Sequence, residues 1–141
     1  MIIKPKLEYP QEISINRYSD DRGILSYLEL PFDAKRFYMI SQFTGSRPRG
    51  QHAHKNLTQF LFCSSGAFSI ELISPLKKWE YRLTPDSVGL LIPPGYWRNL
   101  SNFTSDGVCV VLASSVYEES DYIRDFFEYQ EWFKEAFADE S

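Results

Sequence analysis

The stretch that decides the fold is RPRGQHAHKNLTQFLFCSSG, residues 47–66. It contains the only two histidines of the chain, His52 and His54, at positions i and i+2. In an extended strand these positions point to the same face of the sheet. We therefore expect both imidazoles to face the protein interior together. This spacing favours a functional role for the pair over packing alone.

The rest of the chain reads as short strands separated by turns. Eight segments show period-2 alternation or enrichment in β-branched and aromatic residues, namely 23–30, 36–43, 57–64, 67–74, 78–84, 87–93, 97–103 and 107–114. Turn signals such as TPDS and PPG lie between them. This pattern predicts an all-β fold, a sandwich or barrel.

The tail ESDYIRDFFEYQEWFKEAFADES contains neither glycine nor proline. Its apolar residues recur at three- and four-residue steps, at Ile123, Phe126, Phe127, Phe133 and Phe137. This spacing predicts a helix over about 119–138, capped by Ser120 or Asp121. The polar face is acidic, so we expect the helix to pack on the barrel or on a partner subunit and not on a membrane.

Length and composition narrow the class of protein. The 141 residues suit one domain, 1–141, with the barrel over about 12–116. The net charge of -4 argues against nucleic-acid binding. Neither a signal segment nor a transmembrane run is recognisable, which favours a cytoplasmic protein. Cys63 and Cys109 lie in apolar runs and are expected to be buried thiols, with a disulfide as the alternative.

Two segments resemble the two motifs of cupins, which are small β-barrels. The first motif, with H-x-H, a glutamate and a closing glycine, reads HAHKNLTQFLFCSSG here, with Gln59 in place of the glutamate. The second, P-x-G-x-x-H-x-x-x-N, reads PPGYWRNLSN over 93–102, with Arg98 in place of the histidine. The resemblance implies a cupin, or jelly-roll, barrel followed by the one C-terminal α-helix.

These two departures bear on metal binding. A neutral amide is a poor ligand for a hard or borderline cation, and an arginine stays protonated without a lone pair to give. We therefore expect no metal and no other cofactor, which disfavours a metal-dependent dioxygenase. The histidines are then free for proton transfer near neutral pH.

A narrower resemblance rests on four blocks: KRFYMI, PRGQHAHKNLTQ, GLLIPPGYW and VVLASSVYEESDYIRDF. They follow one another as in the WxcM-like nucleotide-sugar 3,4-ketoisomerases, metal-free cupins that act on dTDP-4-keto-6-deoxyglucose. The likeness runs from about residue 12 to about residue 130, and DDRGILSYLE looks like the family's first barrel strand. It implies a homodimer that moves the keto group of a dTDP-linked 4-keto-6-deoxy sugar from C4 to C3, in deoxyamino sugar biosynthesis.

The chemistry can be assigned to residues that match the family's motifs. The reaction removes a proton from C3, passes through an enediol and delivers a proton to C4. His52 and His54 match the catalytic pair, and a neutral imidazole suits the base, which we assign to His52. Tyr38 matches an active-site tyrosine and can relay a proton between the two oxygens. Arg98 can stabilise enolate charge or, alternatively, form a rim salt bridge.

The family's second-motif histidine is arginine in some members, which bears on the C4 configuration. For this chain we favour the gluco product over the galacto product.

Substrate binding is expected from the basic residues around the histidines. Arg49 and Lys55 can donate charge-assisted hydrogen bonds to a diphosphate, although Lys55 also suits a solvated surface. Arg22 can reach the ligand or pair with Asp20 or Asp21 in a turn. Gln59 and Trp97, the tryptophan of the second motif, complete the expected binding set.

Two other functions remain open at this point. One is a nucleotide-sugar 3,5-epimerase-like enzyme, which also uses a histidine base and a tyrosine acid. The other is a non-catalytic nucleotide-sugar-binding cupin.

Overall fold

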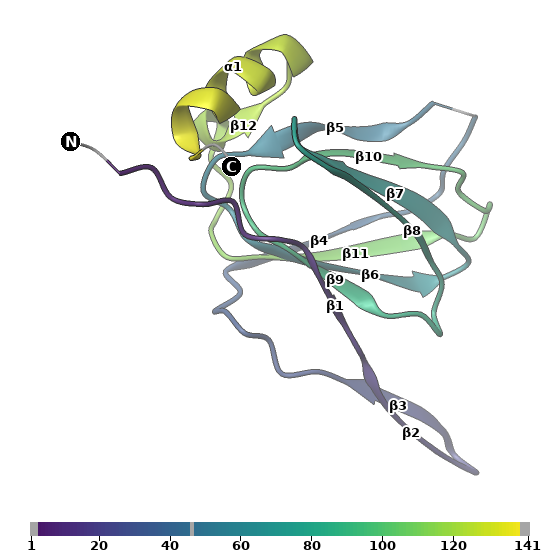
Figure 1. Ribbon diagram of the computed structural model, residues 1–141. Helices are drawn as coiled ribbons and strands as arrows, with labels where there is room; N and C mark the ends of the chain where they lie inside the picture. The colour runs from purple at the N-terminus through teal and green to yellow at the C-terminus, as the bar shows by residue number, and fades with distance from the viewer. Residues whose placement is uncertain (1–2, 46, 139–141) are drawn as a thin grey trace.

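This computed structural model describes residues 3–45 and 47–138. The strands are β1 Gln11–Ile13, β2 Asn16–Asp20, β3 Gly23–Tyr27, β4 Arg36–Ile40, β5 Arg49–His54, β6 Gln59–Ser65, β7 Phe68–Ile73, β8 Lys78–Leu83, β9 Gly89–Ile92, β10 Trp97–Ser101, β11 Val108–Ala113 and β12 Tyr122–Ile123. Ten of these strands form two five-stranded sheets, in the orders β1-β9-β6-β11-β4 and β12-β5-β10-β7-β8, which face one another (Figure 1). The all-β expectation and all eight strand segments are confirmed; β1, β2 and β12 were not expected.

The core lies between the inner faces of the two sheets. Along β7 in one sheet, Phe68, Ile70 and Leu72 are buried and alternate with more exposed residues. Along β11 in the other sheet, Cys109 and Val111 follow the same alternation. Strands of both sheets therefore present a period-2 apolar face to a shared interior, as sheet-on-sheet packing requires.

Strand β5 reaches its place in the second sheet through a glycine. Gly50 has φ +87°, and a Cβ there would lie 3.0 Å from Leu100 Cδ1 and 3.1 Å from the carbonyl oxygen of Arg98. The β5–β10 register also shifts between Arg98 and Asn99. Only glycine combines this left-handed conformation with so close an approach of β10. Beyond Gly50, the strand carries His52 and His54 alongside β10 and β12.

The C-terminal helix begins later than the sequence indicated. A 3₁₀ turn, Glu119–Asp121, and strand β12 precede helix α1, which spans Phe126–Ala136. The cap is Asp125, whose Oδ1 accepts from the Glu128 backbone N–H at 2.9 Å. The expected start at about 119 and the expected cap at Ser120 or Asp121 were both wrong. Tyr122 and Ile123 pair with β5 and so cannot belong to the helix.

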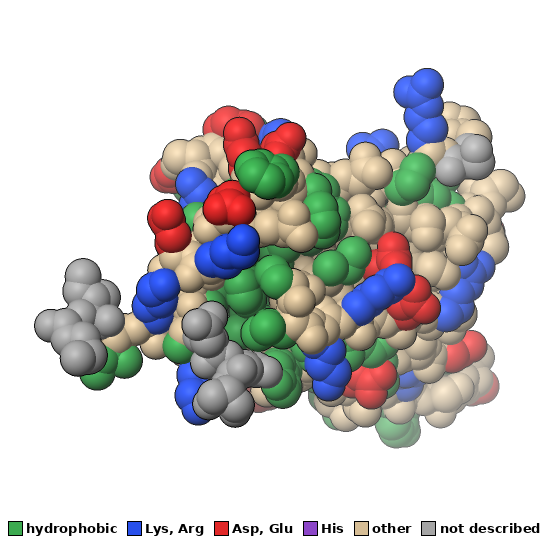
Figure 2. All heavy atoms as spheres, turned by 45° about the horizontal axis from the view of Figure 1, so that its top comes forward, with side chains coloured by type: hydrophobic (Ala, Val, Ile, Leu, Met, Phe, Trp, Pro, Cys, Tyr) green, Lys and Arg blue, Asp and Glu red, His purple; other side chains and the backbone are tan. Residues whose placement is uncertain are grey.

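The helix buries only part of the apolar face that was expected. Tyr129 and Phe133 are buried against the barrel, while Phe127 is 70% exposed. Acidic side chains gather over α1 in Figure 2, in agreement with an acidic solvent face. The three- and four-residue steps identified the helix, but aromatic residues on both of its faces obscured which one is buried.

The segment 16–27 forms a hairpin outside both sheets. Strands β2 and β3 pair with each other in a separate two-stranded sheet that projects below the barrel in Figure 1. We call this hairpin the arm. Arg17 ties it to the β8–β9 turn by donating to the carbonyls of Pro85 and Ser87. The expectation that DDRGILSYLE forms the first barrel strand was wrong, because that role belongs to β1, which pairs with β9.

The cysteines behave as the sequence indicated. Cys63 and Cys109 are free, buried and opposite each other in the register of β6 and β11. Burial raises the pKa of both thiols, so they remain protonated. In the part of the chain that the structure describes, no helix is long and apolar enough to cross a membrane.

The buried hydroxyl of Tyr129 joins α1 to the barrel. It lies 2.9 Å from the carbonyl oxygen of Ile73 and 2.6 Å from that of Gly95. We expect Tyr129→Phe to lower the free energy of unfolding by about 1–3 kcal/mol, because it leaves buried carbonyls without their donor. Urea denaturation measures this. Phe127→Ala on the exposed face is the control, expected to change stability by less than about 0.5 kcal/mol. Equal effects of the two substitutions would contradict this role of the hydroxyl.

Candidate active site

Two imidazoles from β5 meet inside the barrel. His52 Nε2 lies 3.1 Å from His54 Nε2, and His52 Nδ1 lies 2.9 Å from the carbonyl oxygen of Gly50. His54 is fully buried, and neither histidine is visible on the face shown in Figure 2. The expected common face is therefore observed, and the two rings are close enough to exchange a proton directly.

A carboxylate that the sequence analysis missed completes this array. Asp121 Oδ2 lies 2.9 Å from His54 Nδ1, and Asp121 Oδ1 accepts from the Asn56 backbone N–H at 2.7 Å. The ring of Tyr122 packs on both imidazoles, with centroid distances of 5.1 Å to His52 and 4.4 Å to His54. Both residues belong to the segment that was assigned to the helix. The extended pair Tyr122–Ile123 beside β5 is what brings them to the histidines.

A second group of polar side chains crosses the barrel from β10 to β4. The Arg98 guanidinium, 2% exposed, donates to Gln59 Oε1 and to the carbonyl of Tyr96 at 3.3 Å. Gln59 Nε2 in turn donates to the Tyr38 hydroxyl at 3.2 Å. These two hydrogen bonds fix the orientation of the Gln59 amide. Because the Tyr38 hydroxyl accepts in the second of them, its proton remains available to another acceptor.

The buried charge of Arg98 has no carboxylate partner. Among the described residues, none of the ion pairs involves Arg98, and its Nε has no hydrogen-bond partner. A buried guanidinium with an unused donor is costly unless an anionic group binds beside it. Its position excludes the rim salt bridge that the sequence left open, and marks the barrel interior as a site for developing negative charge.

The same environment keeps the imidazoles neutral. Burial, aided by the positive charge of Arg98, lowers the pKa of His52 to about 4 and also lowers the pKa of His54. Burial raises the pKa of Tyr38, against the opposing effect of Arg98. Near neutral pH the site therefore holds two neutral imidazoles, a protonated phenol and a cation, a combination suited to moving a proton next to a carbonyl.

The residues expected to bind substrate are spread over the molecule. Arg49 is exposed at the start of β5 and lines a cavity of about 440 Å³ with Arg47 and Phe103. Lys55 is exposed and lines a different cavity, near Trp132. Of the expected set, only Gln59 lies among the polar groups of the barrel interior.

Two expected binding residues lie elsewhere in this chain. Arg22 sits at the tip of the arm, 2.6 Å from Asp20, so the turn ion pair is what the structure contains. The indole of Trp97 packs on Phe126 and Tyr129 of α1. The pleat of β10 explains this, because neighbouring residues point to opposite faces and Arg98 points inward.

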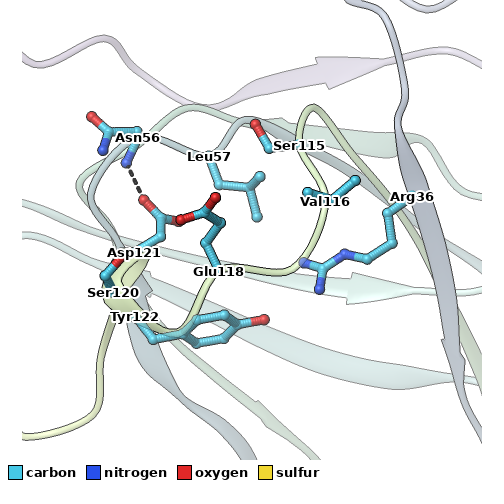
Figure 3. A pocket seen from close by; sticks show the side chains of 9 residues that line it. All are labelled: Arg36, Asn56, Leu57, Ser115, Val116, Glu118, Ser120, Asp121 and Tyr122. Carbon is cyan, nitrogen blue, oxygen red and sulfur yellow. Dashed lines mark hydrogen bonds between the residues drawn. The ribbon is translucent and has the colours of Figure 1, made fainter.

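A cavity of about 190 Å³ adjoins Asp121 (Figure 3). Figure 3 shows the carboxylate turned toward the Asn56 backbone, with Glu118 beside it and Arg36 of β4 on the opposite wall. The cavity is large enough for several water molecules. Asp121 therefore stands between the buried histidines and a polar space next to the surface.

The donor set of the barrel does not suit a metal. Within residues 3–45 and 47–138, no cluster of three or more His, Cys, Asp or Glu side chains can hold a metal ion. Gln59 and Arg98 occupy the two cupin ligand positions and bond to each other. The positive charge of Arg98 would repel a cation there.

Comparison with known proteins gives consistent matches. The sequence model described as "FdtA: WxcM-like, C-terminal" matches residues 9–134. A TDP-4-oxo-6-deoxy-alpha-D-glucose-3,4-oxoisomerase from Aneurinibacillus thermoaerophilus is 38% identical over 124 residues, which cover 85% of this chain and 89% of that protein.

Two solved structures extend the comparison to the fold. A mutant of the 3,4-ketoisomerase QdtA from Thermoanaerobacterium thermosaccharolyticum, in complex with TDP-4-keto-6-deoxyglucose, matches with a TM-score of 0.87 and 36% identity, covering 94% of this chain and 99% of that one. The TDP-quinovose 3,4-ketoisomerase WlaRB from Campylobacter jejuni matches with a TM-score of 0.82 and 34% identity, covering 89% and 99%.

The lowered pKa of His52 gives a pH dependence of stability. An unfolded chain protonates this histidine near its ordinary pKa of 6.5, but the folded chain does so only near 4. Between these values the unfolded state binds more protons, so the free energy of unfolding falls as the pH falls from 6.5 toward 4. We expect His52→Asn to reduce this slope, measured by urea denaturation from pH 7.5 to 4.5. A steeper slope in the variant would mean that the folded protein holds His52 as a cation.

Proposed function

Because this chain belongs to the FdtA, WxcM-like C-terminal family, we propose that it is a TDP-sugar 3,4-ketoisomerase that converts TDP-4-keto-6-deoxyglucose to a TDP-3-keto-6-deoxyhexose. The observation that carries the proposal is the buried, unpaired guanidinium of Arg98 on the strand beside two neutral imidazoles. A keto shift needs a base at carbon and a positive group for the enolate that forms. The barrel interior supplies both.

We assign the removal of the C3 proton to His52. Its Nδ1 faces the carbonyl oxygen of Gly50, which can only accept, so Nδ1 carries the ring proton. Nε2 is then the basic nitrogen, and His54 lies next to it as a second site for the proton. The C3–H electron pair becomes the C3=C4 bond while the C4 carbonyl becomes an enolate oxygen. Return of a proton to C4 leaves the ketone at C3.

The two substrate oxygens are assigned to Tyr38 and Arg98. The Tyr38 hydroxyl accepts from Gln59, so its own proton is free to pass to O4, and the resulting phenolate takes the proton of O3 in exchange. The free Nε–H of Arg98 can stabilise the negative charge on the enediolate. Burial makes this contribution larger than it would be in water. Gln59 acts by orienting both groups and is a positioning residue.

The diphosphate is assigned to the basic end of β5. Arg49 and Arg47 line the same cavity of about 440 Å³, a volume in the range of small-molecule sites. Charge-assisted hydrogen bonds from guanidinium groups suit phosphate oxygens. Lys55 lines a separate cavity and Trp97 packs on α1, so the diphosphate is not assigned to either of them.

For the product we propose the gluco configuration at C4. The relative WlaRB is a TDP-quinovose enzyme, and quinovose is 6-deoxyglucose. Arg98, adjacent to the histidine pair, is the residue we expect to influence the face of C4 protonation.

We also propose that the protein is a homodimer joined through the arm. The pairing of β2 with β3 puts Tyr18, Leu25 and Tyr27 on one face, and all three side chains are more than half exposed. Strand β4 lies at the edge of its sheet with Phe37 and Met39 exposed. Exposed apolar groups beside an unpaired sheet edge favour addition of a strand from another chain. The arm carries Arg22 at its tip, so any substrate contact of Arg22 would be with a partner's site.

The function is tested with TDP-4-keto-6-deoxyglucose in deuterated water, with NMR reporting label and configuration at C4. We expect turnover in the presence of EDTA, and His52→Asn to lower kcat by at least ~10²-fold, the usual scale for a general base. Affinity for TDP should change little, because binding depends on other residues. His54→Asn should also lower kcat, to a smaller extent. A fully active His52→Asn enzyme would remove His52 from the mechanism.

The dimer is tested by light scattering at micromolar concentration. We expect twice the 16.5 kDa mass of the chain. Leu25→Glu should shift the mass to that of the monomer, because it puts a charge into the proposed apolar contact. The matched control is Leu76→Glu, which changes an exposed leucine in the β7–β8 turn and should leave the dimer intact. A wild-type mass of 16.5 kDa would refute the assembly.

A further inference from the structure

When both rings are neutral, the histidine pair has three hydrogen-bond positions but only two ring protons to fill them. The carbonyl of Gly50 can only accept, so it requires a proton on His52 Nδ1. The carboxylate of Asp121 requires a proton on His54 Nδ1. A neutral imidazole has a single N–H, so both Nε2 atoms, 3.1 Å apart, then carry lone pairs.

This arrangement is poised to accept one proton. Two lone pairs at that distance repel each other, whereas one proton between them forms a hydrogen bond shared by both rings. The positive charge that results lies one ring away from the Asp121 carboxylate. The contact between the two Nε2 atoms is therefore where a proton taken from a carbon acid would be held.

We propose that Asp121 is a positioning residue of the active site, which fixes the tautomer of His54 so that the Nε2 contact between His54 and His52 stays open for the substrate's C3 proton. The inference rests on the proposed ketoisomerase function for its catalytic consequence, but not for the tautomer itself. Asp121 does not touch the substrate and acts through His54.

Asp121 is built into the fold for this orientation. Its Oδ1 accepts from the Asn56 backbone N–H, and its own backbone oxygen accepts from the Lys55 N–H at 3.0 Å. Its side chain is 13% exposed, on the edge of the cavity in Figure 3. Both carboxylate oxygens thus have fixed donors, so the side chain cannot turn away from His54 without losing them.

Asp121 brings negative charge to a histidine pair whose other charged neighbours are arginines. Arg98 on β10, Arg36 on β4 and Arg124 after β12 each disfavour a proton on the imidazoles. The ring of Tyr122 packs on both and brings no charge to the contact. Among the described residues, Asp121 is the carboxylate bonded to the pair. It offsets part of the surrounding positive charge when the pair is protonated.

The substitution Asp121→Asn separates this role from simple packing. The Asn56 N–H requires an acceptor, so the amide oxygen takes that position and the amide NH₂ faces His54 Nδ1. His54 must then carry its proton on Nε2 and donate it to His52 Nε2. The variant has nearly the same shape, but the lone pair that would take the C3 proton is occupied.

The first test reads the tautomers of the whole protein without substrate. NMR of ¹⁵N-labelled histidine near neutral pH is expected to show Nδ1–H for both rings in the wild type, and Nε2–H for His54 in Asp121→Asn. Because no sugar is involved, this result is independent of the proposed function. A wild-type His54 protonated on Nε2 alone would overturn the proposal, and this measurement does not depend on the folding of a variant.

The second test measures turnover of TDP-4-keto-6-deoxyglucose. We expect Asp121→Asn to lower kcat by about 10²- to 10⁴-fold with KM nearly unchanged, the range for losing a general base or its correct tautomer. The matched control is Asp125→Asn, which keeps a capping side chain at the start of α1 and should retain wild-type kcat. If Asp121→Asn kept the wild-type kcat while the wild-type enzyme turned over the sugar, the proposal would fail and the proposed function would remain.

Discussion

A guanidinium buried inside the barrel without a carboxylate partner is the constraint that organises this protein. Arg98 is hydrogen-bonded to Gln59 and to the carbonyl of Tyr96, and its charge is left uncompensated among the described residues. That charge favours neutral imidazoles on the neighbouring strand. By the same electrostatic repulsion it would disfavour a bound cation. The same charge favours a bound group that develops negative charge. One side chain therefore influences both the protonation of the histidines and the kind of ligand that the barrel interior can hold.

Much of the fold could be predicted from the sequence because strands bury one side. The alternation in β7 is visible in the letters alone, whereas β11 is apolar throughout and is marked as a strand by its β-branched residues. What alternation does not reveal is which strands pair. The segment 23–27 has a strand pattern, yet it belongs to the arm and not to the barrel. The start of α1 was misplaced for a similar reason, because Ile123 fits a helical spacing but pairs with β5.

The candidate site was predictable where it follows a motif and unpredictable where it follows tertiary structure. His52, His54, Gln59 and Arg98 stand at fixed spacings, and their common interior location follows from the strand period. Asp121 is 67 residues from His54 and reaches it only because β12 pairs with β5. No local spacing contains that information. That Trp97 points away from the barrel interior follows from the strand period, since its neighbour Arg98 points inward, but its contact with α1 is again a tertiary one.

The arm has a consequence for how the protein responds to dilution. A two-stranded hairpin that pairs only with itself is marginally stable in water, and its link to the barrel runs through Arg17. If a second chain covers its apolar face, the free energy of local opening includes the free energy of association and rises with protein concentration. Amide hydrogen exchange in residues 16–27 would then slow as concentration increases, while exchange in β6 and β11 would not. The stability of the arm would therefore depend on protein concentration as well as on the sequence of the chain.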